Sequence, residues 1–463
     1  MYDADAMKHA SNDLDIRNAY SRDASGVELV PEYVARPSSA AEVVELMRES
    51  HAGRVPVTTA GGQSSMTAAS ITDQGLLLSL RALTNTLDVN PETRTVRVDA
   101  GVIVADVRIA AAQHGLLFTP DPTSEKESTV GGAIACNASG ARSLRYGATR
   151  RHVRALTVAL ANGDVVEFRR PALEKNTVGY AMAHDPVDWF IGSEGTLGVV
   201  LSAEFGLLPR PEQSIGLAVP FPDERSALSF VSAARRSNKV HPRCLEFFDE
   251  RAVVIVREAE GSTVDANGTC LVYIEETGDD INLDAELPLD EWLQLAELHN
   301  ADSGDIRVYD SEPAMLEARR LRHAVPATMN ERGACFRAAG GRKVSTDWAV
   351  PFPLLAETLA KARAHADTHG VERAVAYGHA GNGHPHQNFL ARDAVELHKI
   401  EAVVEATLRD VLAVGGTVAA EHGIGKLKRR WLPMQMSALQ QGAMRALKHE
   451  LDPHGLLAPG NVL

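Results

Sequence analysis

A chain of 463 residues is too long for a single ordinary hydrophobic core and predicts two or three domains. Its hydrophobic fraction of 44% and charged fraction of 23% are typical of a soluble globular protein, and no apolar stretch is long enough to predict a membrane span. The formal net charge of −14, without a strong cluster of basic residues, argues against nucleic acid as the main partner.

The N-terminus and the cysteines bear on the cellular compartment. The opening residues, MYDADAMKHASNDLDIRNAY, are acidic and polar, so no signal peptide is expected. The four cysteines lie far apart without a CxxC pair, which favours buried thiols over a disulfide framework or an iron–sulfur site. They are Cys136, Cys244, Cys270 and Cys335. The expected compartment is the cytoplasm, or the cytoplasmic side of the inner membrane for a peripheral protein.

From residue 30 to about 210, short strands and helices alternate without a regular βαβ rhythm, which indicates an α+β domain. The spacing predicts a helix that ends at Gly53 and a second helix closed by Gly115. Strands are expected in 55–62, 75–83 and 93–101, with LDVNPET (87–93) as a turn before the last. The run RALTVALANGDVVEF predicts a hairpin, with positive φ at both Asn162 and Gly163.

LLPRPEQ at 207–213 is typical of a domain boundary. Beyond it, strands are expected in 214–221, 241–249 and 269–276, and helices in 224–237, 290–300 and 353–370. This order predicts a second, α/β-sandwich domain over 211–415. The last stretch is expected to be helical, with Gly455 as its cap.

Three glycine-rich stretches occur in the N-terminal half: TTAGGQSSMTAAS (58–70), STVGGAIACNASGARSLRYG (128–147) and FIGSEGTLGVV (190–200). Glycine lets a backbone approach a ligand closely and turn its N–H groups toward anionic oxygens. Three such loops within about 140 residues suggest one extended ligand with a pyrophosphate. The sequence contains neither GxGxxG, the motif of Rossmann dinucleotide sites, nor GxxxxGK[ST], the Walker motif, which argues against both kinds of site.

Together with PDPTS at 120–124, these loops resemble the FAD-binding domain of the vanillyl-alcohol oxidase-type flavoproteins. Within that superfamily the chain resembles the group of D-lactate dehydrogenase, glycolate oxidase and D-2-hydroxyglutarate dehydrogenase, from about residue 30 to the C-terminus. The resemblance implies an α+β fold with a two-part PCMH-type FAD-binding domain over 30–210, preceded by an N-terminal extension over 1–29. A substrate or cap domain over 211–415 would follow, and then a C-terminal segment over 416–463 that packs back on the FAD domain.

The resemblance also implies how non-covalent FAD is held. Residues 61–65 would wrap the pyrophosphate, the second loop would line the flavin, and the third loop would lie by the ribityl–adenine side. Ala60 replaces an arginine of the group, and Gln63 and Ser65 replace glycines. No histidine occurs in the first loop, so covalent attachment of the flavin there is not expected. The implied FAD-binding residues are Gly61, Gly62, Gln63, Ser64, Ser65, Pro120, Thr123, Gly131, Gly132, Asn137, Ser139, Gly140, Tyr146, Glu194 and Gly195.

Residues 378–389, GHAGNGHPHQNF, carry three histidines. Alone, this stretch fits a metal-binding loop, a phosphate-cradling glycine turn or a His-rich surface loop. The group carries GHxGDGNxHxN and, some forty residues later, GEHGIG, which match GHAGNGHPHQN and AEHGIG here. The resemblance implies that His379, His386 and Glu421 bind a divalent metal, zinc or manganese, and that His422 is the general base.

Two imidazoles and one carboxylate leave coordination positions open, as in catalytic metal sites. Such a metal can chelate the carboxylate and hydroxyl of an α-hydroxy acid and lower the hydroxyl pKa. The loop departs from the group at two positions, because Asn382 stands where the group has aspartate and His384 where it has asparagine. His384 is therefore an extra imidazole that could replace a ligand, contact the substrate or be inert.

A substrate carboxylate also needs a fixed cation. LEARRLRHAVP resembles a segment of the group that makes Arg319 the best match, while GGRKVSTDWAVP offers Lys343. Asn388 matches an asparagine of the group after the second ligand histidine. The alternative is that the arginines of the first segment, such as Arg320, only solvate a helix face. In the closing segment LDPHGLLAPGNVL, Ala458 and Asn461 replace an asparagine and a lysine of the group.

These observations predict an FAD-dependent, metal-assisted dehydrogenase that oxidises a D-2-hydroxy acid, D-lactate or a similar acid, by hydride transfer to flavin N5. Electrons would pass to a quinone, a cytochrome, an electron-transfer flavoprotein or an iron–sulfur subunit. The alternatives are a non-catalytic subunit of a larger oxidase complex, a glycolate-oxidase-type subunit of such a complex, another flavin chemistry on the same fold, or a plain metal- or ligand-binding module. The substrate side chain, the metal, the acceptor and the oligomeric state stay open, a homodimer being one expected assembly.

Overall fold

The computed structural model describes residues 7–259, 261, 269–278 and 287–463, so part of the expected N-terminal extension lies outside the described residues. The chain forms two compact units, each of which has its own core. Unit 1 comprises residues 1–140, 146–210 and 421–463, and unit 2 comprises residues 141–145 and 211–420. The C-terminal segment thus returns to the unit that the N-terminal half builds.

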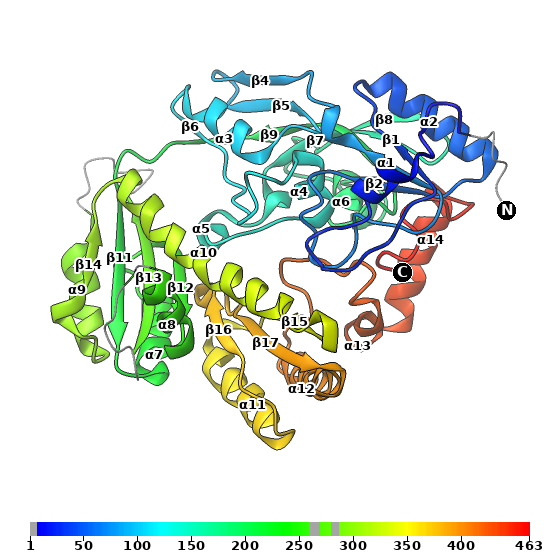
Figure 1. The fold of residues 1–463 in the computed structure, drawn as a ribbon. Coiled ribbons are helices and arrows are strands. Elements are labelled where there is room, and N and C mark those ends of the chain that lie inside the picture. The colour runs from blue at the N-terminus through cyan, green and yellow to red at the C-terminus, as the bar shows by residue number, and fades with distance from the viewer. Residues whose placement is uncertain (1–6, 260, 262–268, 279–286) are drawn as a thin grey trace. The chain divides into compact units, whose positions relative to one another are not determined.

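Unit 1 contains a three-stranded parallel sheet in the order β1-β3-β2 and a five-stranded antiparallel sheet in the order β4-β5-β9-β7-β8 (Figure 1). A two-stranded ribbon pairs β10 with β6. The strands are β1 (Tyr33–Ala35), β2 (Val57–Ala60), β3 (Leu76–Ser79), β4 (Leu87–Asn90), β5 (Thr95–Asp99), β6 (Leu116–Leu117), β7 (Val153–Ala159), β8 (Val165–Arg169), β9 (Val199–Gly206) and β10 (Leu208–Pro209). The helices are α1 (Leu14–Ala19), α2 (Ala40–Gly53), α3 (Val104–Ala112), α4 (Val130–Cys136), α6 (Val187–Phe190), α13 (Leu432–Gln435) and α14 (Ala438–Leu451), and α5 (Ser143–Tyr146) spans the sequence boundary between the units.

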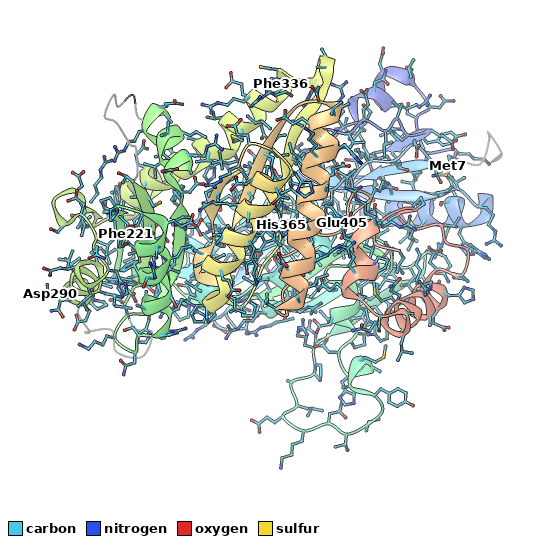
Figure 2. All side chains as sticks on the ribbon, turned by 90° about the horizontal axis from the view of Figure 1, so that it is seen from below. Met7, Phe221, Asp290, Phe336, His365 and Glu405 are labelled. Atoms are coloured by element: carbon cyan, nitrogen blue, oxygen red, sulfur yellow. The ribbon has the colours of Figure 1, made fainter. Side chains whose placement is uncertain are left out.

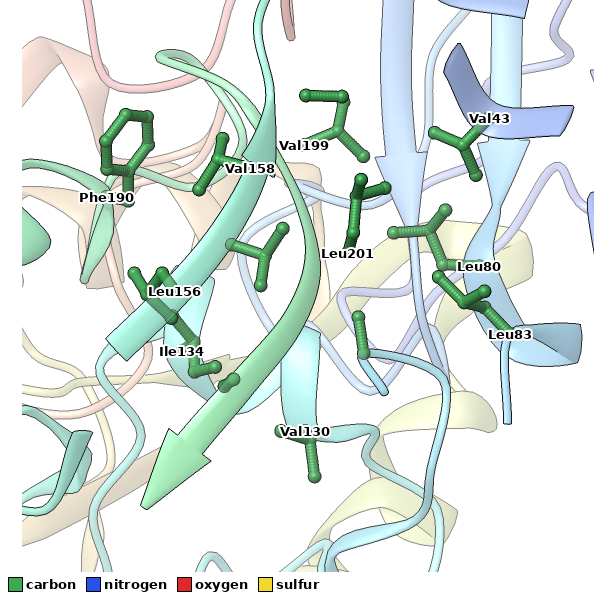
Figure 3. Packing of buried hydrophobic residues seen from close by; sticks show 14 of the residues in the cluster. Val43, Leu80, Leu83, Val130, Ile134, Leu156, Val158, Phe190, Val199 and Leu201 are labelled. Atoms are coloured by element: carbon green, nitrogen blue, oxygen red, sulfur yellow. The ribbon is translucent and has the colours of Figure 1, made fainter. Parts of the chain in front are cut away.

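The core of unit 1 anchors the helix that carries the second glycine loop. Side chains of β7, β9 and α4 gather in one buried cluster, as Figure 3 shows. The labelled members are Val43, Leu80, Leu83, Val130, Ile134, Leu156, Val158, Phe190, Val199 and Leu201. Burying each large aliphatic side chain contributes roughly 1.5–3 kcal/mol, so α4 has a fixed place beneath β9.

Several local expectations for unit 1 are confirmed and four are wrong. Helix α3 ends at Ala112 with Gln113 as its cap, so Gly115 lies in the turn beyond and does not close the helix. The first helix ends at Gly53, where the next residue, Arg54, takes the left-handed conformation with φ 58. Residues 87–90 form strand β4 rather than a turn, because Leu87 to Asn90 pair with β5. The β7–β8 hairpin is present, but only Gly163 has a positive φ, so its turn is not the expected two-residue type. Helix α14 ends at Leu451 with Asp452 as its cap, and Gly455 lies in the turn beyond.

Unit 2 is built on a seven-stranded sheet in the order β14-β11-β13-β12-β16-β17-β15. All of its strand pairs are antiparallel. The strands are β11 (Ser214–Phe221), β12 (Pro242–Phe248), β13 (Cys270–Thr277), β14 (Arg307–Tyr309), β15 (Gly340–Ser345), β16 (Val375–Gly378) and β17 (His386–Asp393). The helices are α7 (Glu224–Arg236), α8 (Glu250–Ala259), α9 (Leu289–Leu298), α10 (Glu312–Ala334), α11 (Leu355–Thr368) and α12 (Ala394–Ala413).

Helices cover the sheet of unit 2. Helices α11 and α12 lie side by side, and His365 of α11 bonds through Nε2 to Asp410 Oδ2 of α12 at 2.8 Å; Figure 2 shows this pair of helices with His365 and Glu405 labelled. Helices α8 and α10 pack together on a separate cluster that includes Val253, Val325 and Tyr377. Helices α8 and α10 and strands β14, β16 and β17 were not anticipated from periodicity. Among the described residues, no helix has the length and apolar character needed to cross a membrane.

Candidate active site

The three glycine loops come together within unit 1. A Cβ on Gly61 would lie 2.2 Å from Thr129 Oγ1 and one on Gly62 would lie 1.9 Å from the carbonyl oxygen of Glu127, so the first loop packs directly on the second. The third loop joins them, because Glu194 N donates to Ala135 O at 2.9 Å. The loops that the sequence places up to about 140 residues apart therefore form one surface of unit 1.

The third loop also holds the EHGIG segment. The half-buried carboxylate of Glu194 accepts hydrogen bonds from the backbone N–H groups of Ile424 and Gly425, both at 2.7 Å. Burial raises the pKa of Glu194, while these two donors act against that rise. A Cβ on Gly423 would lie 2.7 Å from Glu194 Oε1, so a glycine is needed there. The glycines of EHGIG thus serve close packing, and the Glu194 side chain is committed to this segment.

Asn461 and Lys426 form a further connection that the sequence did not suggest. Asn461 Nδ2 donates to Ala69 O at 2.9 Å and to Glu194 O at 3.2 Å, so it links the first and third loops. Lys426 Nζ donates to Asn461 Oδ1 at 2.7 Å. Burial lowers the pKa of Lys426 to about 8. A lysine directly after EHGIG therefore lies where the C-terminal segment meets the loops, and its position after that motif was the only signal.

Buried hydroxyl groups in these segments fit a ligand. Within the part of the chain that the structure describes, Tyr146 Oη and Thr119 Oγ1 are buried without a hydrogen-bond partner. A buried hydroxyl without a partner costs about 1–3 kcal/mol, so both groups are expected to meet a bound molecule. Gln63 behaves differently, because its side-chain amide donates to the carbonyl oxygens of Tyr20 and Arg22 at 3.1 and 3.0 Å.

The remaining residues of the expected FAD site lie in the same loops. Gly131 and Gly132 form the first turn of α4, and Thr129 caps that turn by accepting from Gly132 N at 3.2 Å. Asn137 ends α4 in the left-handed conformation with φ 53. The others occupy loop positions: Ser64, Ser65, Pro120, Thr123, Ser139, Gly140 and Gly195.

In unit 2, one face of the sheet carries most of the expected substrate and metal residues. Residues paired across antiparallel strands point to the same face. The pairs Lys343 with Leu390, Ser345 with Asn388, Tyr377 with His386 and Glu246 with Tyr273 follow this face from β15 to β13. His379 follows directly on β16, and His386 begins β17, so the histidine loop connects two neighbouring strands.

The glycines of the histidine loop are used for packing. Gly378 has φ +116, and a Cβ there would lie 2.8 Å from His386 Cδ2. A Cβ on Gly383 would lie 2.0 Å from Val350 O, and one on Gly381 would lie 2.8 Å from Leu144 Cδ2. These contacts explain the spacing of glycine in GHAGNGHPH without an anion.

The loop brings its three histidines together. His379, His384 and His386 are all buried, with exposures of 3%, 4% and 7%. Their ring centroids lie 4.6 Å apart for His384 and His386, and 5.3 Å apart for each of the other two pairs. One ring nitrogen from each histidine lies within 4.8 Å of the others, which is a geometry that can hold a metal ion.

A buried carboxylate orients the first histidine. His379 Nδ1 lies 2.6 Å from Glu246 Oε1, and both side chains are almost fully buried. A carboxylate that accepts from Nδ1–H leaves Nε2 with its lone pair available to a metal, which is the usual arrangement for a ligating histidine. Glu246 was not among the residues expected from the sequence. Its signal was an acidic residue at a buried position of a strand, in PRCLEFF.

His384 and Asn382 differ in their surroundings. His384 is buried and its Nε2 lies 3.2 Å from Asp347 Oδ1, although the two groups are not aligned for a hydrogen bond. Asn382 is exposed at the end of the 3₁₀ turn Ala380–Asn382. Of the two departures from the resembling group, only His384 thus belongs to the histidine cluster.

Three further residues of the expected substrate site also lie in unit 2. Lys343 on β15 is partly buried, has no hydrogen bond or ion pair to any described residue, and has its pKa lowered to about 8 by burial. Asn388 accepts from Ser345 Oγ at 2.7 Å and donates to Tyr377 Oη at 3.1 Å. Arg319 on α10 donates to Glu275 through Nε at 2.6 Å and through Nη2 at 3.3 Å.

Glu275 gathers further cations around Arg319. Its buried carboxylate also accepts from Arg142 Nε at 3.0 Å and Arg243 Nε at 2.6 Å. Burial alone would raise the pKa of Glu275, but the charges of Arg142 and Arg243 outweigh burial and lower that pKa. Glu312 also accepts from Arg243 Nη2 at 3.2 Å, so three guanidinium groups face two carboxylates and one positive charge is left in excess, which suits an anionic ligand.

Glu421 and His422 belong to unit 1 and follow directly on Ala420, the last residue of unit 2. Ser139 Oγ lies 3.5 Å from Glu421 Oε1, and Cys136 Sγ lies 3.3 Å from Glu421 O. Ala420 N donates to Asp347 O at 2.8 Å, which fixes the chain within unit 2 one residue before Glu421.

Family models match both halves of the chain. The model described as "FAD binding domain" matches residues 31–169, and the model described as "FAD linked oxidases, C-terminal domain" matches residues 210–462. The second match alone covers more than half of the chain. The protein therefore belongs to the FAD-linked oxidase family, which confirms the resemblance, the PCMH-type fold class and the identification as an FAD-dependent oxidoreductase.

Individual relatives agree over nearly the full length. The chain is 33% identical to a D-2-hydroxyglutarate dehydrogenase of Xanthomonas citri pv. viticola over 441 residues, or 93% of this chain and 89% of that one. It is 31% identical to a D-lactate dehydrogenase of Archaeoglobus fulgidus, with 93% and 91% covered, and 29% identical to the glycolate oxidase subunit GlcD of Bacillus subtilis, with 96% and 92% covered. A solved alkyldihydroxyacetonephosphate synthase shares the fold with a TM-score of 0.73 at 17% identity, covering 98% of this chain and 83% of that one.

Proposed function

We propose that this protein is an FAD-dependent, metal-assisted dehydrogenase that oxidises a D-2-hydroxy acid, D-lactate or a similar acid, to the 2-oxo acid. The observation that carries the proposal is one face of the unit 2 sheet, which carries His386 of the buried three-histidine cluster and, farther along on β15, a partly buried lysine without an ion pair among the described residues. A metal site and a fixed cation are what a 2-hydroxy acid requires, because its hydroxyl must be activated and its carboxylate held.

Lys343 and Asn388 are proposed to bind the substrate carboxylate. Lys343 meets no anion among the described residues, and a partly buried ammonium group without a counterion favours binding of a carboxylate. Asn388 is held by Ser345 and Tyr377, so its amide has a fixed orientation. Arg319 is placed by Glu275 and adds positive charge, which favours anionic substrates over neutral alcohols.

His379 and His386 are proposed to hold a divalent metal, zinc or manganese, with Glu421 as the carboxylate ligand. The donor set fits a metal, because two buried imidazoles lie close together and the first has its Nδ1 bound to Glu246. When bound, such a metal supplies a Lewis acid for the hydroxyl and carboxylate oxygens of the substrate. The assignment of Glu421 rests on its place in the EHGIG motif and on the covalent link to Ala420.

His422 is proposed to take the hydroxyl proton of the substrate. An imidazole is suited to this role, because its ordinary pKa lies close to neutral pH. FAD, when bound at the glycine loops of unit 1, supplies the acceptor for the two electrons and the hydrogen of the substrate Cα. The residues of the protein then contribute binding, orientation and proton transfer.

The reduced enzyme must pass electrons onward, and we propose a quinone, a cytochrome, an electron-transfer flavoprotein or an iron–sulfur subunit as acceptor in the cytoplasm or at the inner membrane.

The names of the relatives support the 2-hydroxy acid class, since they include two dehydrogenases of such acids. The similarity to a glycolate oxidase subunit favours one second candidate, in which the chain acts within a larger complex.

Anaerobic reduction of the flavin tests the proposal. The purified, FAD-loaded protein is mixed with a panel of D- and L-2-hydroxy acids that includes D-lactate, glycolate and D-2-hydroxyglutarate, and the flavin absorbance is followed. Bleaching by one or more D-acids is expected. Bleaching by glycolate alone would favour the second candidate, and absence of bleaching by every acid of the panel would refute a 2-hydroxy acid substrate.

A further inference from the structure

We infer that His384 is a third imidazole ligand of the metal site, which makes this chain differ from the group that it resembles. The inference rests on the metal site of the proposed function and extends it to a residue outside the expected ligand set. The group carries asparagine at this position, so the usual ligand assignment says nothing about His384.

The position of His384 in the cluster is the first argument. Its ring centroid lies 4.6 Å from that of His386 and 5.3 Å from that of His379. One nitrogen of each ring lies within 4.8 Å of the others. Ligand nitrogens at about 2.0–2.1 Å from one ion lie roughly 3 Å from each other. Shifts of about an ångström in the three rings would therefore place all three nitrogens on one ion.

The buried nitrogen of His384 is the second argument. His384 Nε2 has no hydrogen-bond partner among the described residues, and its side chain is only 6% exposed. Leaving a buried polar nitrogen unsatisfied costs about 1–3 kcal/mol, and a metal ion would remove this cost. The Asp347 carboxylate lies 3.2 Å from the same nitrogen, so the local charge favours a cation rather than an anion there.

The backbone keeps His384 in this position. Pro385 follows it, and a residue before proline is held in the extended region. In an extended chain, residues i and i+2 point to the same side, so the sequence His-Pro-His directs His384 and His386 together. On the other side, Gly383 has φ +69 and packs against Val350 O, where a Cβ would lie 2.0 Å away. The loop therefore has little freedom to turn His384 away from the cluster.

The extra ligand changes which metal the site prefers. Three histidines and Glu421 would supply four protein ligands, and a chelating 2-hydroxy acid would add two oxygens. Imidazole nitrogen suits Zn²⁺ better than Mn²⁺, and four protein ligands are the number that Zn²⁺ prefers. The His384 ligand thus predicts a stronger preference for Zn²⁺ over Mn²⁺ than a set of two histidines and one carboxylate would have.

Metal titration tests the role of His384. Metal is first removed from the FAD-loaded wild-type protein and from the variants His384→Asn, His384→Ala and His386→Ala. Each protein is then titrated with Mn²⁺, followed by electron paramagnetic resonance, and with Zn²⁺ in competition. His365→Asn is the matched control, because His365 pairs with Asp410 on helices away from the loop. Melting temperature and flavin content report whether each variant is folded.

The expected result for His384→Asn is at least a tenfold weaker affinity for Zn²⁺, with a smaller loss for Mn²⁺ and therefore a larger ratio of Mn²⁺ to Zn²⁺ affinity. His386→Ala should lose binding of both metals, and His365→Asn should bind as the wild type does. If His384→Asn and His384→Ala keep the wild-type affinities for Zn²⁺ and Mn²⁺ while His386→Ala loses them, the inference is overturned and the proposed metal site stands. If His386→Ala also binds normally, the proposed metal site itself fails.

Discussion

Glu246 is expected to control metal affinity without touching the metal. Its carboxylate accepts from His379 Nδ1 at 2.6 Å, with the two side chains 1% and 3% exposed. Loss of such an outer partner lowers metal affinity by about 10- to 100-fold, or about 1.4–2.8 kcal/mol. Glu246→Gln keeps the shape and an acceptor oxygen but removes the charge, so a loss near tenfold is expected. Glu246→Ala leaves Nδ1–H buried and unpaired, so a loss near 100-fold is expected.

The assay is competition for Mn²⁺ and Zn²⁺ against a chromophoric chelator, with flavin content measured in parallel. Glu276→Gln is the control, because Glu276 is a buried acid of the same sheet that binds Trp292 Nε1 at 3.1 Å and the backbone of His241, and touches none of the three clustered histidines. The control should bind metal as the wild type does. Wild-type metal affinity in both Glu246 variants would refute the orientation of His379 by this carboxylate.

Two further predictions concern charge and backbone. Substrate affinity should fall above about pH 8, where Lys343 loses its proton, and Lys343→Met should bind weakly at every pH; a pH profile of KM checks this. Burial lowers the pKa of Lys343 in the folded protein from 10.5 to about 8, so the unfolded chain binds more protons than the folded protein between about pH 8 and pH 10.5. The free energy of unfolding should therefore rise with pH across this range in the wild type and stay level in Lys343→Met. Gly425 has φ +50, and a Cβ there would lie 2.3 Å from Thr67 O, so Gly425→Ala should lower the free energy of unfolding by at least about 2 kcal/mol and reduce the flavin content. Gly442 lies in α14 with open space around it, so Gly442→Ala should raise the free energy of unfolding by about 0.5–1 kcal/mol. Equal melting temperatures for the two glycine variants would contradict the packing role of EHGIG.

The sequence predicted elements well where local signals agree. Helix α2 has a serine cap, an amphipathic face and a glycine end, and its bounds matched. Residues 87–90 were misjudged because NPET is a strong turn signal, while the strand before it depends on pairing with β5. Helix α10 was missed because Pro326 and several charges interrupt its pattern, although packing on α8 maintains the helix.

The candidate site was only partly accessible from the sequence, for a physical reason. Sequence motifs identified residues with fixed local spacing, such as His379 and His386. They could not identify the roles of Glu246, Asp347 or Asn461, because these roles depend on strand pairing and on contacts between distant segments. The same limit applies to Lys343, since its lack of a counterion among the described residues is a property of the folded sheet.

The most direct test of metal-assisted oxidation of a D-2-hydroxy acid is the rate of anaerobic flavin reduction with and without metal. Stopped-flow traces are recorded for the best D-acid of the panel and its L-enantiomer, with metal-loaded protein, chelator-treated protein and treated protein after metal is restored. Metal-assisted oxidation of a D-acid predicts fast bleaching by the D-acid that is lost on chelation and regained with metal, and no bleaching by the L-acid. Equal rates for loaded and stripped protein, or equal rates for the two enantiomers, would contradict it.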